Sequence, residues 1–188
     1  MTGKNLFSLP VLIVLMLAVI SAVMLDCVRR REAVYDGVIR AASARHGLDP
    51  LLVKAVVRRE SNFRADARGS KGERGLMQVM PVVGKEYAAW RRWSALPKKG
   101  LLDPELNTEV GCWYLAKAMR RYRAFRDPVP FALAHYNAGG RNVDRWLAAT
   151  RTPGNARQFI RAISYPSTRR YVRQVTRRYR LSRLLRFL

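Results

Sequence analysis

A single acid, Glu60, ends a predicted helix and precedes a polar loop and the glycine-rich segment 75–81, which reads Gly-Leu-Met-Gln-Val-Met-Pro. Because Val56 lies four positions earlier, Glu60 continues the buried row of this helix. Burial and the negative end of the helix dipole both favour a neutral carboxyl group and predict a raised pKa. Such a group can act as a general acid on a leaving oxygen. Taken alone, a glutamate at a helix end is more often structural or solvated.

The segments before Glu60 are predicted to be helical. Apolar residues recur at helical spacing over residues 32–46 and stop at Gly47, which can take the left-handed conformation that ends a helix. Asp49 and Pro50 then supply a capping acid and a proline at the first helical position. The helix that carries Glu60 is therefore expected to begin at Pro50.

The chain after Glu60 is less regular. Residues 62–73 are polar, contain two glycines and read as a loop, and a short helix is expected from about Leu76 to Pro81. A second acid-proline pair, Asp103 and Pro104, predicts the start of another helix. The sequence up to this point shows no alternation with period two.

The second half of the chain continues the helical pattern. One helix is expected to end at Gly139, and shorter helices are expected around residues 143–147 and 159–163. The final twenty residues, 169–188, contain eight arginines and no acid, with leucines spaced for one helical face. That face either lies on an anionic membrane surface or packs onto the domain. The predicted fold class is all-α.

Residues 6–25 form an uncharged, apolar run of the length that crosses a bilayer. We interpret it as an uncleaved membrane anchor, with a removed signal peptide as the alternative because a weak cleavage site is present. Cys27 stands in a poor context for lipid attachment. Arg29, Arg30 and Arg31 follow the run, and basic flanks prefer the cytoplasm, so this rule alone would keep the domain inside.

The formal net charge is +23, from 36 basic and 13 acidic residues. A field of this sign favours nucleic acid, anionic lipid or an acidic polymer as partner. The basic residues are spread over helical segments without a zinc-finger or RNA-binding motif, so we favour solvated basic faces near a membrane over nucleic-acid binding. Cys112 lies in a helical pattern and reads as a small buried hydrophobe.

Five short motifs in order resemble those of the lytic transglycosylases, bacterial cell-wall enzymes whose catalytic domain is similar to goose-type lysozyme. The resemblance covers residues 34 to about 175. The motifs are Glu60-Ser61-Asn62-Phe63, Gly72, Gly75-Leu76-Met77-Gln78 with Met80-Pro81, Ala134-His135-Tyr136-Asn137-Ala138-Gly139, and Thr168 with Tyr171-Val172. The family implies a lysozyme-like helical domain acting on peptidoglycan, without cofactor or metal.

By this resemblance Glu60 is the single catalytic acid and base. It would cleave the β-1,4 bond between N-acetylmuramic acid and N-acetylglucosamine, and would then help the muramyl C6 hydroxyl to close a 1,6-anhydro ring. The family uses no second carboxylate as nucleophile. The implied substrate-binding residues are Ser70, Met77, Gln78, Tyr136, Asn137 and Tyr171. Gln78 is suited to the sugar acetamido groups, and Met77 to an apolar wall.

The loop before the glycine-rich segment departs from the family pattern. Gly69 stands where a serine is common, with Ser70 as a substitute, and Glu73 stands where alanine is usual. Glu73 is a possible second acid that steers a water molecule towards hydrolysis. The alternative is an exposed loop acid paired with Arg74 or another basic side chain. Ser167 stands where a glutamate usually precedes the threonine.

These observations predict three segments: a membrane anchor or signal segment (1–31), a lysozyme-like catalytic domain (32–168) and a basic amphipathic helix (169–188). The leading hypothesis is a single-pass protein of the inner (cytoplasmic) membrane that cuts glycan strands in the periplasm. Small size favours a role in opening the wall for a secretion or conjugation machine. The alternatives are a hydrolytic muramidase and a non-catalytic glycan-binding scaffold, and no nucleic-acid partner is expected.

Overall fold

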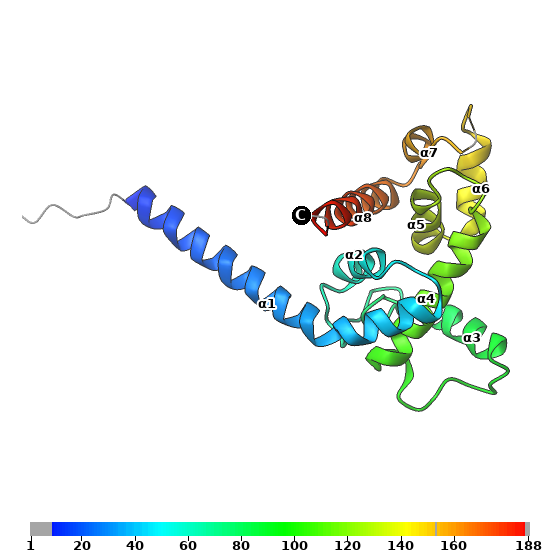
Figure 1. Cartoon of the computed structure of the whole chain (residues 1–188), viewed down its shortest axis with the longest axis horizontal. Helices are drawn as coiled ribbons and strands as arrows, with labels where there is room; N and C mark the ends of the chain where they lie inside the picture. Colours follow the sequence, from blue (N-terminus) through cyan, green and yellow to red (C-terminus); the bar gives the residue numbers. More distant parts are fainter. Residues whose placement is uncertain (1–8, 153, 187–188) are drawn as a thin grey trace, which may run out of the picture.

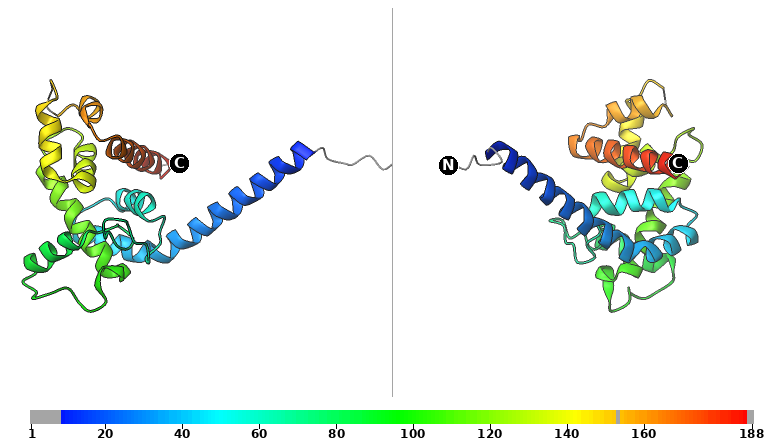
Figure 2. Two further views of the ribbon diagram at one scale, coloured as in Figure 1. Left: turned by 180° about the vertical axis from the view of Figure 1, so that it is seen from behind. Right: turned by 60° about the vertical axis from the view of Figure 1, so that its left-hand side comes forward.

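The computed structural model describes residues 9–152 and 154–186 as helices joined by turns and loops (Figure 1). Within this part of the chain the extended pairing is limited to two isolated bridges, which join Arg74 to Arg68 and to Val79. The all-α class predicted from the sequence is confirmed. Figures 1 and 2 show a long helix, α1, that projects from a bundle of the remaining helices.

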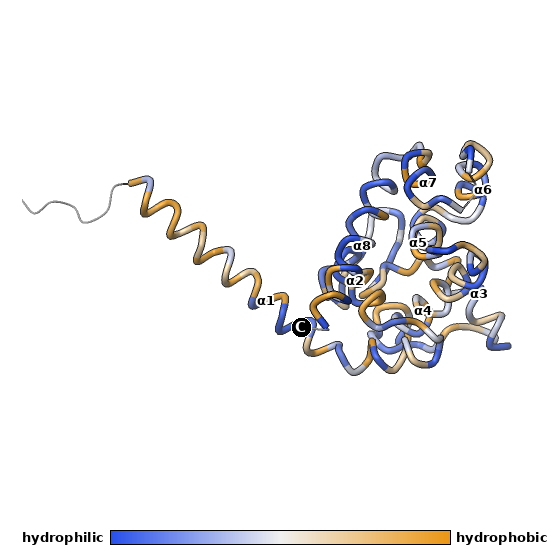
Figure 3. Tube along the Cα trace, turned by 45° about the horizontal axis from the view of Figure 1, so that its top comes forward, coloured by the Kyte–Doolittle hydropathy of each residue, from blue (hydrophilic) through white to orange (hydrophobic). Residues whose placement is uncertain are grey.

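Helix α1 (Leu9–Arg45) is continuous from the apolar run into the domain. The helix expected over residues 32–46 is thus the carboxyl-terminal part of a longer one. Every side chain from residue 9 to residue 26 is exposed, whereas Ile39 and Ala42 are fully buried in the domain. Figure 3 shows the exposed half as an almost uniformly hydrophobic rod. By length and composition this half is a candidate membrane span.

Both predicted acid-proline helix starts are confirmed. Helix α2 (Pro50–Glu60) is capped by Asp49, whose Oδ1 accepts a hydrogen bond of 2.9 Å from the amide of Leu51. Helix α4 (Pro104–Arg121) is capped in the same way by Asp103. A capping acid contributes about 1 kcal/mol by satisfying an amide that the helix itself leaves free.

The short helix expected from Leu76 to Pro81 is wrong. The described chain forms turns at residues 75–78, and helix α3 (Pro81–Trp90) begins where the sequence suggested an end. Gly75 and Gln78 both have positive φ, which interrupts a right-handed helix. Proline lacks an amide hydrogen and fits the first turn, so Pro81 starts a helix here.

Asn107 of α4 holds the turn at residues 75–78 in place. Its fully buried side chain accepts a hydrogen bond of 2.8 Å from the amide of Met77 and donates to the carbonyls of Arg74 and Leu101. Leu101 belongs to the short 3₁₀ helix η1 (Gly100–Leu102). A buried amide side chain thus satisfies backbone groups that regular secondary structure would otherwise pair.

The second half of the chain forms helices α5 (Val129–Ala138), α6 (Gly140–Ala148), α7 (Ala156–Ala162) and α8 (Pro166–Leu185). Helix α5 is the centre of the domain, since its residues 129–135 are all buried. It packs against α4, α6 and α8, and α8 also packs against α2. The predicted end of α5 at Gly139 is confirmed, with a φ of 81° that glycine adopts readily.

Helix α8 changes character along its length. Its first half buries Tyr171, Val172 and Val175, so the basic segment predicted to begin at residue 169 is part of a helix that is packed in the domain. Leu181, Leu184 and Leu185 are 53, 67 and 60 % exposed. The alternative in which these leucines pack onto the domain is therefore wrong. The division of the chain at residues 31 and 168 stays a prediction, and both points lie inside continuous helices.

Both cysteines carry free thiols. Cys112 is completely buried in α4, and burial raises the pKa of its thiol to about 12. It is the small buried hydrophobe that the sequence predicted.

Gly75→Ala is expected to destabilise the chain by about 2–4 kcal/mol, because it combines strained backbone with overpacking. Gly75 has a φ of 74°, and a Cβ there would lie 2.6 Å from the carbonyl oxygen of Leu101. Gly37→Ala is the matched control: nothing lies within 4 Å of its added Cβ on α1, so a gain of about 0.5–1 kcal/mol is expected. Chemical denaturation of the full chain in detergent measures both; equal effects would contradict the prediction.

Candidate active site

Glu60 is the last residue of α2 and is partly buried, and its carboxyl group lies near Tyr136 of α5 and Tyr171 of α8. Burial is the main cause that raises its pKa, to about 7, and the nearby Glu73 raises it further. Tyr171 and Arg59 lower it. The raised pKa predicted from the helical row of Val56 is confirmed, and the carboxyl group is poised to give or take a proton near neutral pH.

Ser61 and Phe63 fix the chain directly after the acid. The buried Ser61 hydroxyl donates a hydrogen bond of 2.8 Å to the carbonyl of Leu76, which ties the end of α2 to the glycine-rich turn. Phe63 is also buried, and both Asn62 and Phe63 have positive φ. The Glu-Ser-Asn-Phe motif is thus one acid followed by three residues that set a sharp exit from the helix.

Tyr136 approaches the same carboxyl group from α5. Its hydroxyl donates a hydrogen bond of 2.8 Å to the carbonyl of Met77, and burial followed by the charge of Glu60 raises its pKa well above the usual value. The phenol therefore stays neutral. The Met77 side chain is fully buried against Gly111, so the apolar wall predicted for it has no exposed surface in the structure.

Tyr171 approaches Glu60 from α8. Its hydroxyl is buried, has no hydrogen-bond partner among the described residues, and comes close enough to the carboxyl of Glu60 to lower its pKa without completing a hydrogen bond. The guanidinium of Arg59 lies 5.7 Å from the centre of the Tyr171 ring. An unsatisfied buried hydroxyl beside a titratable acid is a group available to a substrate or to the charged form of that acid.

Gln78 faces the site with one half of its amide. The Nε2 atom donates hydrogen bonds to the carbonyls of Gly75 and Ala67, at 2.9 and 3.2 Å, and this fixes the orientation of the amide. The Oε1 atom accepts no hydrogen bond from the described residues. The Gln78 amide was predicted to offer both a donor and an acceptor, but only the acceptor is available. This acceptor suits the N–H of an acetamido group.

The side chain of Glu73 packs directly against the backbone of Gly69. The Glu73 carboxylate accepts a hydrogen bond of 2.8 Å from the amide of Lys71, and it forms no ion pair within the described ranges. The alternative pairing with Arg74 is therefore not observed. A Cβ on Gly69 would lie 2.3 Å from Glu73 Oε2 and 3.0 Å from Gln78 Oε1. The absence of a side chain at Gly69 leaves room for the Glu73 carboxylate. The two departures from the family pattern, Gly69 and Glu73, are therefore linked by their packing.

Two other predicted residues lie at the edge of the site. Asn137 is exposed on α5, and its Oδ1 accepts a hydrogen bond of 2.8 Å from the hydroxyl of Thr168 on α8, which leaves the amide N–H groups for a ligand. Ser70 is exposed at the tip of the loop that carries Glu73. Sequence reasoning missed the bracing roles of Ser61 and Asn107, which only their buried hydrogen bonds reveal. No group of acids, histidines or cysteines suited to a metal ion occurs in the described part of the chain.

Comparisons with known proteins place this helical domain in a family. Residues 37–159 match the transglycosylase SLT domain, and the chain belongs to this family. The soluble lytic murein transglycosylase of Escherichia coli K12 is 33 % identical over 122 residues, covering 64 % of this chain and 18 % of that protein. The membrane-bound lytic murein transglycosylase F of Desulfosudis oleivorans is 36 % identical over 104 residues, covering 54 % of this chain and 21 % of that protein.

The solved structures agree with the sequence comparison. The lytic transglycosylase Slt of Pseudomonas aeruginosa, solved as an inactive mutant, aligns with a TM-score of 0.67 and 31 % identity over 76 % of this chain and 23 % of that one. The 70-kDa soluble lytic transglycosylase in complex with bulgecin A aligns with a TM-score of 0.74 and 27 % identity over 89 % of this chain and 27 % of that one. The predicted lysozyme-like fold is confirmed, and the chain spans about a fifth of the length of the curated relatives it matches.

The pH profile of glycan cleavage is expected to fall as the pH rises through about 7, because Glu60 then loses the proton that a general acid must donate. Tyr171→Phe removes a group that lowers this pKa, so the alkaline limb of kcat/KM is expected to move to higher pH. Tyr179→Phe is the control on the same helix, since that hydroxyl bonds to Asp49. An unshifted limb in Tyr171→Phe, or equal shifts in both variants, would contradict the assignment.

Proposed function

We propose that the chain is a peptidoglycan lytic transglycosylase that cleaves the β-1,4 bond between N-acetylmuramic acid and N-acetylglucosamine and leaves a 1,6-anhydromuramic acid end. The observation that carries this proposal is the carboxyl group of Glu60 at the end of α2, which lies near Tyr136 and Tyr171 and whose pKa is raised by burial to about 7. Membership in the transglycosylase SLT family supports the same reaction.

In the first step Glu60 donates its proton to the glycosidic oxygen while the bond to the muramyl C1 atom breaks. The N-acetylglucosamine side leaves with a new hydroxyl group. The acetamido group of the muramyl sugar supports the positive charge that develops at C1, so no protein nucleophile is needed. The neutral Tyr136 hydroxyl, held by the Met77 carbonyl, keeps a polar but uncharged wall beside the acid.

In the second step the Glu60 carboxylate takes the proton of the muramyl C6 hydroxyl, and the C6 oxygen bonds to C1. The acid is thereby restored and no water is consumed. The same group serves as acid and then as base because its pKa lies close to neutral pH. We infer that the Oε1 atom of Gln78 and the amide of Asn137 bind sugar acetamido and hydroxyl groups, because neither group is used up by the hydrogen bonds within the chain, and that the exposed Ser70 also contacts the glycan.

Glu60→Gln is expected to lower the rate of peptidoglycan digestion by about 10²–10⁴-fold, because the amide has the shape of the acid without its proton. The measurement is mass analysis of the fragments released from purified peptidoglycan, in which anhydro ends are lighter than hydrolytic ends by one water. Glu105→Gln, an exposed acid in the first turn of α4, is the control. Equal inactivity of wild type and Glu60→Gln would favour the non-catalytic scaffold.

A hydrolytic muramidase is the second candidate, and the placement of Glu73 favours it. This carboxylate raises the pKa of Glu60, so it lies close enough to interact with the acid, and Gly69 provides the space for it. A carboxylate on this side can accept a proton from a water molecule that attacks C1 in place of the C6 hydroxyl. We propose that Glu73 sets the proportion of hydrolytic to anhydro product.

Glu73→Gln is expected to raise the anhydro share of the products, because it removes the base without changing the shape of the loop. Gly69→Ser is expected to displace the carboxylate and have the same direction of effect, since its Cβ would collide with Glu73. The double variant Gly69→Ser/Glu73→Ala restores the common family pattern and should be no more hydrolytic than Glu73→Gln. A ratio that stays the same in all three variants excludes a role for Glu73.

We propose that α1 anchors the protein in the inner (cytoplasmic) membrane with the domain in the periplasm, where a secretion or conjugation machine would need a local gap in the wall. The exposed apolar half of α1 supports an anchor, and relatives named membrane-bound lytic murein transglycosylases support the same location. Peptidoglycan outside the membrane argues for export against the rule for basic flanks at Arg29, Arg30 and Arg31.

A reporter enzyme that is active only after export, fused to the carboxyl terminus of the full chain, is expected to be active. The matched control is the same fusion with a reporter that is active only in the cytoplasm. Activity of the cytoplasmic reporter alone would contradict the periplasmic location and with it the role on the cell wall.

A further inference from the structure

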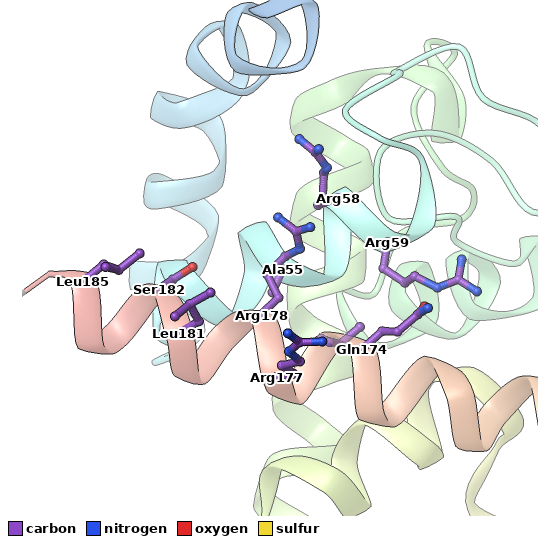
Figure 4. Close-up of a pocket in the computed structure, with 10 residues that line it drawn as sticks. Ala55, Arg58, Arg59, Gln174, Arg177, Arg178, Leu181, Ser182 and Leu185 are labelled. Carbon is purple, nitrogen blue, oxygen red and sulfur yellow. The ribbon is translucent and has the colours of Figure 1, made fainter. Parts of the chain in front are cut away.

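A groove of about 600 Å³ lies between α2 and the second half of α8, on the side of α2 that precedes Glu60 (Figure 4). Four arginines line it, Arg58 and Arg59 from α2 and Arg177 and Arg178 from α8. Figure 4 shows Leu181, Ser182 and Leu185 continuing along α8 towards its carboxyl end. The groove thus combines a cationic half with an apolar half.

The cationic half of the groove has an uncompensated positive charge. None of its four arginines lies within 4.0 Å of a carboxylate of the described residues. Burial, followed by the charge of Arg178, lowers the pKa of Arg58, and the charge of Glu32 on α1 opposes this only in part. Like charges held together without counter-charges are stabilised by an external anion.

The apolar half of the groove is equally unpartnered. Leu181 and Leu185 are 53 and 60 % exposed, although the helix that carries them is packed firmly at Tyr171 and Val175. A helix end that mixes arginine and exposed leucine is typical of a segment that lies in the headgroup region of a bilayer. There the guanidinium groups meet phosphates and the leucines meet the first carbons of the acyl chains.

The position of the groove relative to α1 supports a membrane lipid as its occupant. In Figures 1 and 3 the carboxyl end of α8 points to the side of the domain from which the exposed apolar half of α1 projects, and the right-hand view of Figure 2 shows that the two are separated sideways. Since α1 is continuous, the same helix that would cross the bilayer also fixes which face of the domain is turned towards the lipid. That face carries the groove.

We propose that the groove formed by Arg58, Arg177, Arg178, Leu181 and Leu185 binds the headgroups of anionic phospholipids in the membrane that α1 crosses, and so holds the domain against the bilayer. This inference rests on the anchoring role of α1 in the proposed function. The groove would be a second attachment to the membrane, formed mainly by residues far from α1 in the sequence. Each arginine near an anionic surface contributes on the order of 1 kcal/mol, which corresponds to roughly fivefold in the docking equilibrium.

The test is amide hydrogen exchange of residues 177–186 in the full chain, reconstituted in nanodiscs. One set of discs contains phosphatidylglycerol and phosphatidylethanolamine, and the other contains phosphatidylcholine alone. Exchange is expected to be slower in the anionic discs for the wild type. Arg177→Gln/Arg178→Gln is expected to lose this protection by roughly 25-fold, or to the level of the neutral discs.

The control is Arg141→Gln/Arg145→Gln, which removes the same charge from exposed positions on α6, at the far side of the domain from the end of α8. The control should exchange like the wild type. Equal exchange of the wild type in both kinds of disc, or equal effects of the two pairs, overturns the proposal. Protection of residues 177–186 in neutral discs by added inorganic polyphosphate, as strong as in anionic discs, overturns the choice of lipid as the ligand.

Failure of this inference is separable from failure of the proposed function. Co-elution of the chain with the discs reports whether α1 inserts, and digestion of solubilised peptidoglycan reports the cleavage reaction. A chain that inserts and cleaves glycan, but shows the same exchange of residues 177–186 in both kinds of disc, would refute the lipid groove alone.

Discussion

The structure depends on one constraint: a single carboxyl group must remain buried at the end of α2 without becoming a fixed ion pair. Glu60 meets this constraint because its helix ends there and Ser61 ties that end to the carbonyl of Leu76. In addition, α5 and α8 each bring a tyrosine near the carboxyl group. Burial raises the pKa to about 7, whereas Tyr171 and Arg59 limit the rise. A strong ion pair would lower the pKa of Glu60 and leave no proton to donate near neutral pH. A more apolar site would raise the pKa and leave no carboxylate to accept a proton.

The sequence predicted the parts of the fold that local chemistry determines. Asp49 and Asp103 predict helix starts because a capping acid and the proline after it act on backbone groups within four residues. Gly139 predicts a helix end because the positive φ that ends the helix is also a local property of one residue. The turn at Gly75 was mistaken for a helix because its conformation is set by Asn107, about thirty residues away. Tertiary hydrogen bonds of this kind leave no periodic pattern in the sequence.

The candidate site shows the same division. The burial of Glu60 followed from its helical row, and the tyrosines followed from family motifs. The buried Met77 and the half-occupied amide of Gln78 did not, since residue type gives the chemistry of a side chain but not its direction. The sequence also did not predict that Glu73 packs against Gly69. The structure shows this because a Cβ added to Gly69 would collide with a carboxylate oxygen of Glu73.

The continuity of α1 has a consequence for where the enzyme can work. A flexible linker would let the domain search a deep volume of wall, whereas an unbroken helix sets its height. From Leu25 at the end of the apolar run to the buried Ile39, α1 rises by about 21 Å. If α1 crosses the bilayer and the domain cleaves peptidoglycan, as proposed, the domain reaches glycan strands in a thin layer next to the bilayer and does not reach the outer strands. The distance from the bilayer at which glycan strands are cleaved would then be set by the length of α1.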